Sequence, residues 1–232
     1  MNHLKQNLHN VRSRISSACE SAGRNPAEVT LLAVSKKHSS DRIRELHRLG
    51  QPCFGENYVR EALEKMQQLA HENLEWHYIG PLQSNKTRGV AENFHWVQSI
   101  DRLKIARRLS DQRPDGKPPI NICIQVNIDL EPQKAGAMPD QVRELADAAR
   151  SLPNLHLRGL MAIPRAASAE HDPADSYRRM QRLFRQLNGD GLQLDTLSMG
   201  MSADLEAAIM HGSTMVRIGT DLFGPRPANN ET

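Results

Sequence analysis

The sequence predicts an α/β fold, a single (β/α)8 barrel of the TIM type with one extra helix at its amino terminus. Two observations lead to this prediction. Eight short apolar runs alternate with segments of helical periodicity, and the 232 residues are close to the roughly 250 that such a barrel uses. An open doubly wound sheet is the alternative. Because no linker, repeat or low-complexity segment interrupts the pattern, we expect one domain over residues 1–232.

The eight apolar runs are the expected strands. Continuous apolar runs, rather than alternating ones, are typical of a parallel sheet that is buried on both faces. In chain order the runs are Val29–Ser35, Pro52–Gly55, Leu74–Gly80, His95–Ile100, Ile120–Ile128, Leu157–Ile163, Thr196–Gly200 and Met215–Thr220.

Apolar residues at three- and four-residue spacing predict the helices. The extra helix precedes the first strand, and Gly23 follows it as a stop. Little chain follows the last strand, so we expect the extra helix to cover the surface that a final helix would cover, and residues 225–232 to fray. The stripes are Leu4, Leu8, Val11, Ile15, Ala18 and Ala22; Ile43, Leu46 and Leu49 after a Ser39 or Ser40 cap; Tyr58, Ala62, Met66 and Leu69; Val142, Leu145, Ala146 and Ala149; Tyr177, Met180, Phe184 and Leu187; and Leu205, Ala208 and Ile209.

Composition narrows the class of protein. The hydrophobic content of 38% and net charge of +3 are typical of a soluble globular chain. No segment approaches the ~18 apolar residues of a membrane span, and the start lacks a signal-peptide core, so we expect a cytoplasmic protein. The arginines of residues 178–185 fall on the solvated face of a helix, which argues against nucleic-acid binding. Three distant cysteines and ten histidines without ligand spacing predict no disulfide framework and no metal site.

The active site of such a barrel lies at the carboxyl ends of its strands. Lys36 closes the first apolar strand, where it can either snorkel to the surface or serve as a Schiff-base lysine. Partial burial favours the neutral amine, which attacks an aldehyde. Lys37 follows, but successive strand residues face opposite ways, so only one of the two points into the barrel mouth. Asn57 follows the second strand, where capping a helix is the alternative role.

The last two strands end in small residues that suit an anion. The seventh ends in Ser198-Met199-Gly200-Met201-Ser202, and the eighth ends in Arg217-Ile218-Gly219-Thr220. Small residues let backbone N–H groups approach a ligand, and barrels often hold a phosphate between these loops. An inward Arg217 would suit a pyridine nitrogen and keep it unprotonated. With Lys36 on the neighbouring first strand, these residues predict a site for an aldehyde that carries a phosphate.

Five ordered motifs, spread over nearly the whole chain, resemble the YggS/PROSC-type pyridoxal phosphate homeostasis family. They are Leu32-Ala33-Val34-Ser35-Lys36, Phe54-Gly55-Glu56-Asn57-Tyr58, the run from Trp76 to Lys86, Ser198-Met199-Gly200-Met201-Ser202, and Val216-Arg217-Ile218-Gly219-Thr220. The resemblance implies a fold-type III barrel like the alanine racemase N-terminal domain, with pyridoxal 5′-phosphate as an internal aldimine on Lys36. The expected cofactor-binding residues are Lys36, Asn57, Met161, Ser198, Met201, Ser202, Arg217, Gly219 and Thr220, with no catalytic residue and no metal ligand.

Two positions depart from the family's pattern. Lys134-Ala135-Gly136 stands where Lys-Ser-Gly is usual, and Asp221 follows the phosphate-site threonine where a small residue is expected. A carboxylate beside a phosphate is repulsive unless it points away, so the direction of Asp221 is open.

Three functional classes compete. The first is a carrier that stores or delivers pyridoxal phosphate, with apo-enzymes as transient partners and little or no turnover. The second is a racemase-like enzyme, which needs a second acid or base that alanine racemases take from an additional domain. The third is a lysine-dependent sugar-phosphate aldolase, which would carry no bound chromophore. The visible spectrum separates the third class from the first two.

Overall fold

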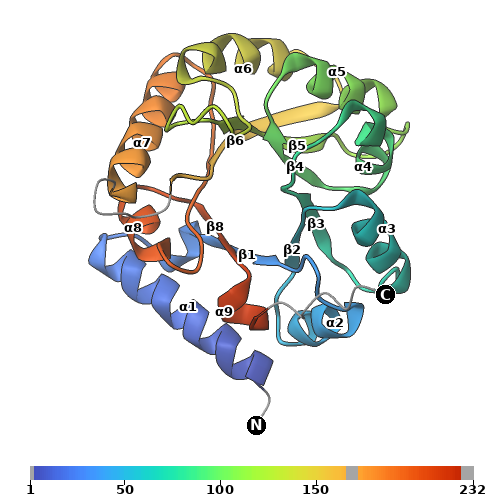
Figure 1. The fold of residues 1–232 in the computed structure, drawn as a ribbon, viewed down its shortest axis with the longest axis vertical. Helices are drawn as coiled ribbons and strands as arrows, with labels where there is room; N and C mark the ends of the chain where they lie inside the picture. Colours follow the sequence, from blue (N-terminus) through green and yellow to red (C-terminus); the bar gives the residue numbers. More distant parts are fainter. Residues whose placement is uncertain (1–2, 166–171, 226–232) are drawn as a thin grey trace.

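The computed structural model describes residues 3–165 and 172–225, and its eight strands form one closed parallel barrel. Neighbours in the chain are neighbours in the sheet, and β8 closes the ring on β1 through the pairs Thr30–Met215 to Ala33–Ile218. Figure 1 shows the helices as a ring around the strands. The closed barrel, rather than an open sheet, is therefore confirmed.

Each strand is found where the sequence predicts it, and no strand end lies more than two residues from its expected position. The bounds are β1 Thr30–Val34, β2 Cys53–Glu56, β3 Glu75–Tyr78, β4 Trp96–Ile100, β5 Ile120–Val126, β6 Leu155–Ala162, β7 Thr196–Ser198 and β8 Met215–Ile218. The last residues of several apolar runs belong to loops instead, because the chain there turns over the barrel mouth.

Most residues of the predicted apolar stripes are buried or half-buried against the core, but the prediction for Tyr58 is wrong: it precedes α3 and is 51% exposed. Outward side chains of the strands, such as Phe54, Val97 and Leu160, pack under buried helix residues in one continuous core. The α-helices are α1 His3–Ser21, α2 Ser40–Arg48, α3 Val59–Gln68, α4 Thr87–Asn93, α5 Leu103–Gln112, α6 Val142–Arg150, α7 Pro173–Gly189, α8 Leu205–Met210 and α9 Thr220–Phe223, with 3-10 turns at Pro26–Glu28, Ser84–Lys86 and Pro139–Gln141. Within the described residues, none of the helices has the length and apolar character needed to cross a membrane.

The extra amino-terminal helix covers the end of the ring. Helix α1 packs against α8 and against the four-residue helix α9, as Figure 1 shows. The side-chain amide of Asn7 donates to the carbonyl of Leu222 at 2.9 Å. Gly23 ends α1 with a left-handed φ of 64°, as predicted. Helix α9 was not predicted, and residues 226–232 of the expected frayed tail lie outside the described residues.

The barrel interior is more polar than the core around it. Trp96, Cys123 and Met161 form a small separate apolar cluster inside the barrel. Beside it runs a line of hydrogen-bonded polar side chains, formed by Arg217, Ser198, Gln98, His77 and Glu75. This line connects the carboxyl mouth of the barrel with its amino end.

Candidate functional site

A cavity of about 270 Å³ opens at the carboxyl ends of the strands. Its wall comes from the ends of β1, β2, β3, β6, β7 and β8, which the barrel closure brings around one mouth. Seven of the nine predicted cofactor residues line it. The lining residues are Val34, Lys36, Asn57, Ile79, Ile163, Met201, Ser202, Ala203, Arg217, Gly219 and Thr220.

The structure separates the two candidate lysines. Lys36 is half-buried and lines the cavity two residues after the end of β1. Lys37 is exposed and does not line it. The backbone of Lys37 turns left-handed, with φ 64°, and its N–H donates to Glu61 Oε1 at 2.5 Å. This turn is the local reason why only the first lysine faces the mouth.

A buried ion-pair network holds the segment that carries Lys36. The ammonium group of Lys65, on α3, donates to the carbonyl of Ser35 at 2.8 Å, to Glu56 Oε1 at 2.7 Å and to Glu61 Oε1 at 2.6 Å. The hydroxyl of Ser35 donates to the same Glu56 oxygen at 2.6 Å. Burial raises the pKa of Glu56, while the charge of Lys65 opposes that rise. Because Glu61 also accepts from Lys37, the chain is tied down on both sides of Lys36.

Arg217 is a buried cation in the cavity wall. Its side chain donates to Ser198 Oγ and to the carbonyl of Ala162, both at 2.8 Å. Burial lowers the pKa of Arg217 to about 10, which still leaves it protonated at neutral pH. No carboxylate in the described part of the chain forms an ion pair with it. A guanidinium has five N–H donors, so Arg217 can serve a further acceptor in the cavity.

Two predicted contact residues lie one layer deeper than the cavity. Ser198 is fully buried, where it donates to Gln98 Oε1 at 2.7 Å and accepts from Arg217. Met161 is fully buried in the interior cluster, and the cavity wall on its strand is formed by Ile163. Side chains inside such a barrel fill it in layers, and the sequence gives the face of a strand but not the layer. The structure thus places Ser198 as support for Arg217 and Met161 beneath the floor, so direct contact of either with a ligand remains only a prediction.

The loop after β7 has a fixed shape. Gly200 has φ +93°, and a Cβ there would lie 2.5 Å from the Cβ of Ala208, so glycine is required. The N–H of Met201 donates to Asp204 Oδ1 at 2.6 Å, and the hydroxyl of Tyr177 donates to Asp204 Oδ2 at 2.7 Å. Asp204 therefore shapes the turn that presents Met201 and Ser202 to the cavity.

One arginine of α1 ties together the loops that follow β7 and β8. Arg14 donates to the carbonyl of Ser202 at 2.9 Å, to Asp221 Oδ2 at 2.5 Å and to Glu206 Oε1 at 2.7 Å. The carboxylate of Asp221 thus points toward α1, and its direction is no longer open. No pattern in the sequence predicts these contacts, which join residues about 190 to 210 positions apart.

Comparison with known proteins identifies the chain. Residues 2–227 match the family model of the alanine racemase N-terminal domain. A pyridoxal phosphate homeostasis protein of Pseudomonas aeruginosa is 54% identical over 226 residues, covering 97% of each chain. That of Escherichia coli is 52% identical over 229 residues, covering 97% of this chain and 98% of its own. The chain belongs to the pyridoxal phosphate homeostasis protein family.

Solved structures agree with this family. PipY of Synechococcus elongatus, in a structure with PLP bound, is 34% identical, with a TM-score of 0.83 over 95% of this chain and 100% of its own. An alanine racemase of Corynebacterium glutamicum is 15% identical, with a TM-score of 0.72 over 100% of this chain and 63% of its own. That second likeness is one of fold.

Four cavity residues of this homeostasis-family chain were not predicted. Val34, Ile79, Ile163 and Ala203 line the wall but have no polar group that would have drawn attention. The one feature of the sequence that could have predicted them is their position at or just beyond the ends of the expected strands. In the segment that departs from the family pattern, Lys134 pairs with Glu131 at 2.6 Å, and its amine donates to the carbonyl of Ile163 at 3.3 Å.

Proposed function

We propose that this chain binds pyridoxal 5′-phosphate with the amine of Lys36 holding the aldehyde, and that it stores and delivers this cofactor instead of turning over amino acids. One observation carries the proposal: a single cavity brings together Lys36, Arg217 and the two loops of small residues. The names of the relatives and the cofactor in PipY support it.

The cavity's polar groups fit such a cofactor. Lys36 supplies a nucleophilic amine, and Arg217 supplies donors that no carboxylate of the described chain occupies. The side-chain oxygen of Asn57 is buried at the cavity and has no hydrogen-bond partner among the described residues. A buried oxygen without a partner is costly, and a donor from a ligand would relieve that cost.

The loops after β7 and β8 suit the phosphate. Ser202 and Thr220 offer hydroxyls, and Gly219 lets the backbone approach closely. Arg14, on α1, donates hydrogen bonds to Ser202 in the first loop and to Asp221, which follows Thr220, in the second. Its positive charge also offsets the negative charge of Asp221. A phosphate held there would meet neutral donors, with the carboxylate of Asp221 turned away toward α1.

Arg217 explains why turnover would be low. When bound, the cofactor supplies an electrophilic carbon and a ring that can accept electrons from an amino-acid substrate. The ring is a strong acceptor only when its nitrogen is protonated. Arg217 stays charged at neutral pH, so beside that nitrogen it would donate a hydrogen bond, keep its own proton and leave the nitrogen unprotonated.

The cavity also lacks a second acid or base. Among its eleven lining residues, all within the described chain, only Lys36 and Arg217 carry an ionisable side chain. A racemase needs a positioned proton donor on the other face of its cofactor, and such a group is typically worth 10²–10⁴-fold in rate. Because the described lining residues include no such proton donor, they favour the carrier over the racemase-like alternative.

Two assays on the cofactor-loaded protein test the proposal. The first measures transfer of cofactor to an apo-enzyme that depends on pyridoxal phosphate, by recovery of that enzyme's activity. The second measures α-proton exchange and racemisation of common amino acids. We expect transfer with racemisation at background rates. Racemisation at ordinary enzyme rates without transfer would establish the enzyme, and a protein without a visible cofactor band would favour the aldolase.

A further inference from the structure

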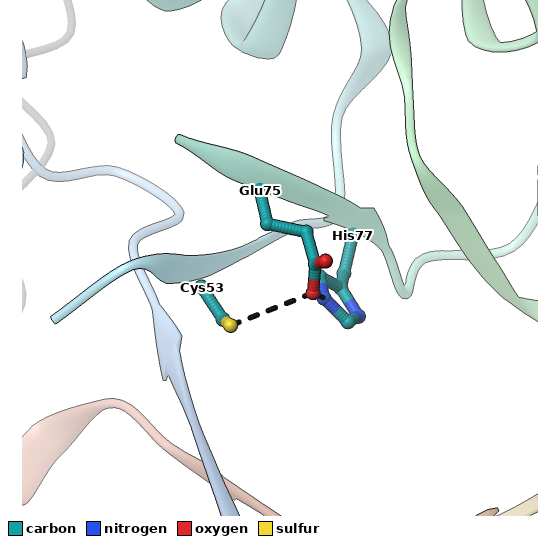
Figure 2. Close-up of side chains that lie close together, drawn as sticks. All are labelled: Cys53, Glu75 and His77. Atoms are coloured by element: carbon teal, nitrogen blue, oxygen red, sulfur yellow. Dashed lines mark hydrogen bonds and ion pairs between the residues drawn. The ribbon is translucent and has the colours of Figure 1, made fainter. Parts of the chain in front are cut away.

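Three potential metal ligands converge at the amino end of the barrel, opposite the Lys36 cavity. Cys53 is the first residue of β2 and Glu75 the first of β3, and the two are register partners across the sheet. His77 lies two residues after Glu75 on the same face. Figure 2 shows the three side chains pointing toward one another, and one ligand atom from each lies within 4.8 Å of the others.

One carboxylate oxygen holds this cluster together. Glu75 Oε1 lies 2.7 Å from His77 Nε2 and accepts from the thiol of Cys53 at 3.5 Å. The hydrogen bond from His77 lowers the pKa of Glu75, and burial, with Glu75 nearby, raises the pKa of Cys53 to about 12. The thiol proton of Cys53 and the ring proton of His77 therefore both point at Glu75. Each of the three side chains has an atom that could donate an electron pair to a cation.

We propose that Cys53, Glu75 and His77 form a site for a borderline-soft divalent cation of the Zn²⁺ class, with a fourth position open to water. A sulfur, a nitrogen and an oxygen match Zn²⁺, whereas Mg²⁺ and Ca²⁺ prefer oxygen ligands alone. A thiolate and a carboxylate together balance the charge of the dication. The spacing in the sequence hides this site, because its ligands come from two strands.

The geometry needs only a small adjustment. Ligand atoms around a tetrahedral Zn²⁺ lie about 3.5 Å apart, given bonds of roughly 2.0–2.3 Å. The present separations run from 2.7 Å to at most 4.8 Å. His77 is fixed, since it is fully buried, stacked on Trp96 at 5.1 Å and bonded to Gln98 at 2.9 Å. The side chain of Glu75 is 44% exposed, so it is the group free to move.

The site has access from outside. Cys53 also lines a second cavity, of about 390 Å³, together with Thr30, Pro52 and residues of α1. The side chain of Glu75 is 44% exposed, so an ion can reach the cluster from solvent without entering the Lys36 mouth. The metal site therefore shares no residue with the proposed cofactor site, although Gln98 and Ser198 link His77 to Arg217.

Binding would release one proton per ion. The thiol of Cys53 loses its proton as sulfur bonds to the metal. The proton on His77 Nε2 moves to Nδ1, and Gln98 turns its amide so that its oxygen accepts from that N–H. Metal-bound histidines usually donate their second N–H to such an acceptor.

Equilibrium dialysis and titration calorimetry with Zn²⁺, on the full chain, test the proposal. We expect one ion per chain, release of about one proton, and no competition from excess Mg²⁺. Co²⁺ in place of Zn²⁺ should give the intense ligand-field bands of a tetrahedral site and a thiolate charge-transfer band. Cys53→Ala and Glu75→Gln should each weaken binding more than about tenfold.

Matched controls make the result decisive. Cys19→Ala removes a buried thiol of α1 outside the cluster and should bind the ion as the wild type does. Lys36→Ala should also leave metal binding unchanged, which separates this proposal from the cofactor site. Glu75→Gln alters a part-exposed side chain, so it tests the site even if Cys53→Ala folds poorly. Stoichiometric binding that survives both cluster variants, or no binding at millimolar Zn²⁺, would overturn the proposal.

Discussion

Replacing Lys65 by methionine should destabilise the fold and loosen the segment that carries Lys36. The side chain of Lys65 is 7% exposed and makes three hydrogen bonds, to Ser35, Glu56 and Glu61. Methionine keeps most of the volume and removes the charge. The buried carboxylate of Glu56, with no exposed surface, then loses its only cationic partner among the described residues.

The size of the effect follows from burial. The side chain of Glu61 is 27% exposed and can bind water in place of Lys65, so breaking this ion pair lowers the free energy of unfolding only slightly. The carbonyl of Ser35 loses one hydrogen bond, worth about 1 kcal/mol. Glu56 cannot reach water, and breaking a buried pair by removing one partner costs about 3–5 kcal/mol. Together these losses come to about 4–6 kcal/mol, which at ~2–4 °C per kcal/mol for a chain of this size lowers the melting temperature by ~8–24 °C.

The pH dependence gives a sharper signature. Without Lys65, the pKa of Glu56 rises further above the value it has in the unfolded chain. The folded variant then holds a proton that the unfolded chain releases, so its stability falls as pH rises from the unfolded pKa of about 4.3 through the raised folded value. The gap in melting temperature between wild type and variant should therefore be smaller near pH ~5 than near pH ~8.

Thermal and urea unfolding of three proteins measure this effect. They are the wild type, Lys65→Met, and Lys65→Met combined with Glu56→Gln. The double variant removes the stranded charge and keeps a partner for the Ser35 hydroxyl, so it should recover most of the lost stability. A Lys65→Met protein within about 1 kcal/mol of wild type, or one whose deficit does not change with pH, would refute the reasoning.

Other substitutions test the walls of the cofactor cavity. Arg14→Gln should weaken cofactor binding several-fold, because it frees the loops after β7 and β8. Arg12→Gln on the same helix, whose side chain donates to the carbonyl of Gly50 away from these loops, is the control. Cofactor titration followed by absorbance measures both, and equal affinities would contradict this role of Arg14. Ser202→Ala and Thr220→Ala should each weaken binding about fivefold, the equivalent of ~1 kcal/mol for one neutral hydrogen bond. If either variant lost more than about a hundredfold in cofactor affinity, the phosphate would not be held mainly by backbone N–H groups.

The sequence predicts the barrel well because its strands are buried on both faces. Apolar runs such as Leu31–Val34 leave few alternatives to a parallel sheet, and eight strand-like runs with helices between them favour closure. Lys36 stands out for the same reason, as a charge at the end of an apolar run. Strand ends are predictable sites, so seven of the nine predicted residues lie around one cavity.

What the sequence could not give are contacts between distant segments. Nothing near Arg14 indicates that its guanidinium reaches Ser202 and Asp221. Lys65 does carry a signal, since it lies on the apolar stripe of α3 between Ala62 and Leu69, where a charge needs a partner. The depth of Met161 and Ser198 was also hidden, because alternation along a strand fixes a face and not a layer.

The central claim is that Lys36 holds the aldehyde of pyridoxal 5′-phosphate, and borohydride reduction of the loaded protein followed by peptide mass spectrometry tests it most directly. We predict that the reduced cofactor mass is found on the peptide that contains Lys36. Lys36→Ala should lose both the adduct and the visible absorbance band while its melting curve stays cooperative. A cofactor adduct found solely on Lys37 or Lys134, with Lys36 unmodified, would contradict the account.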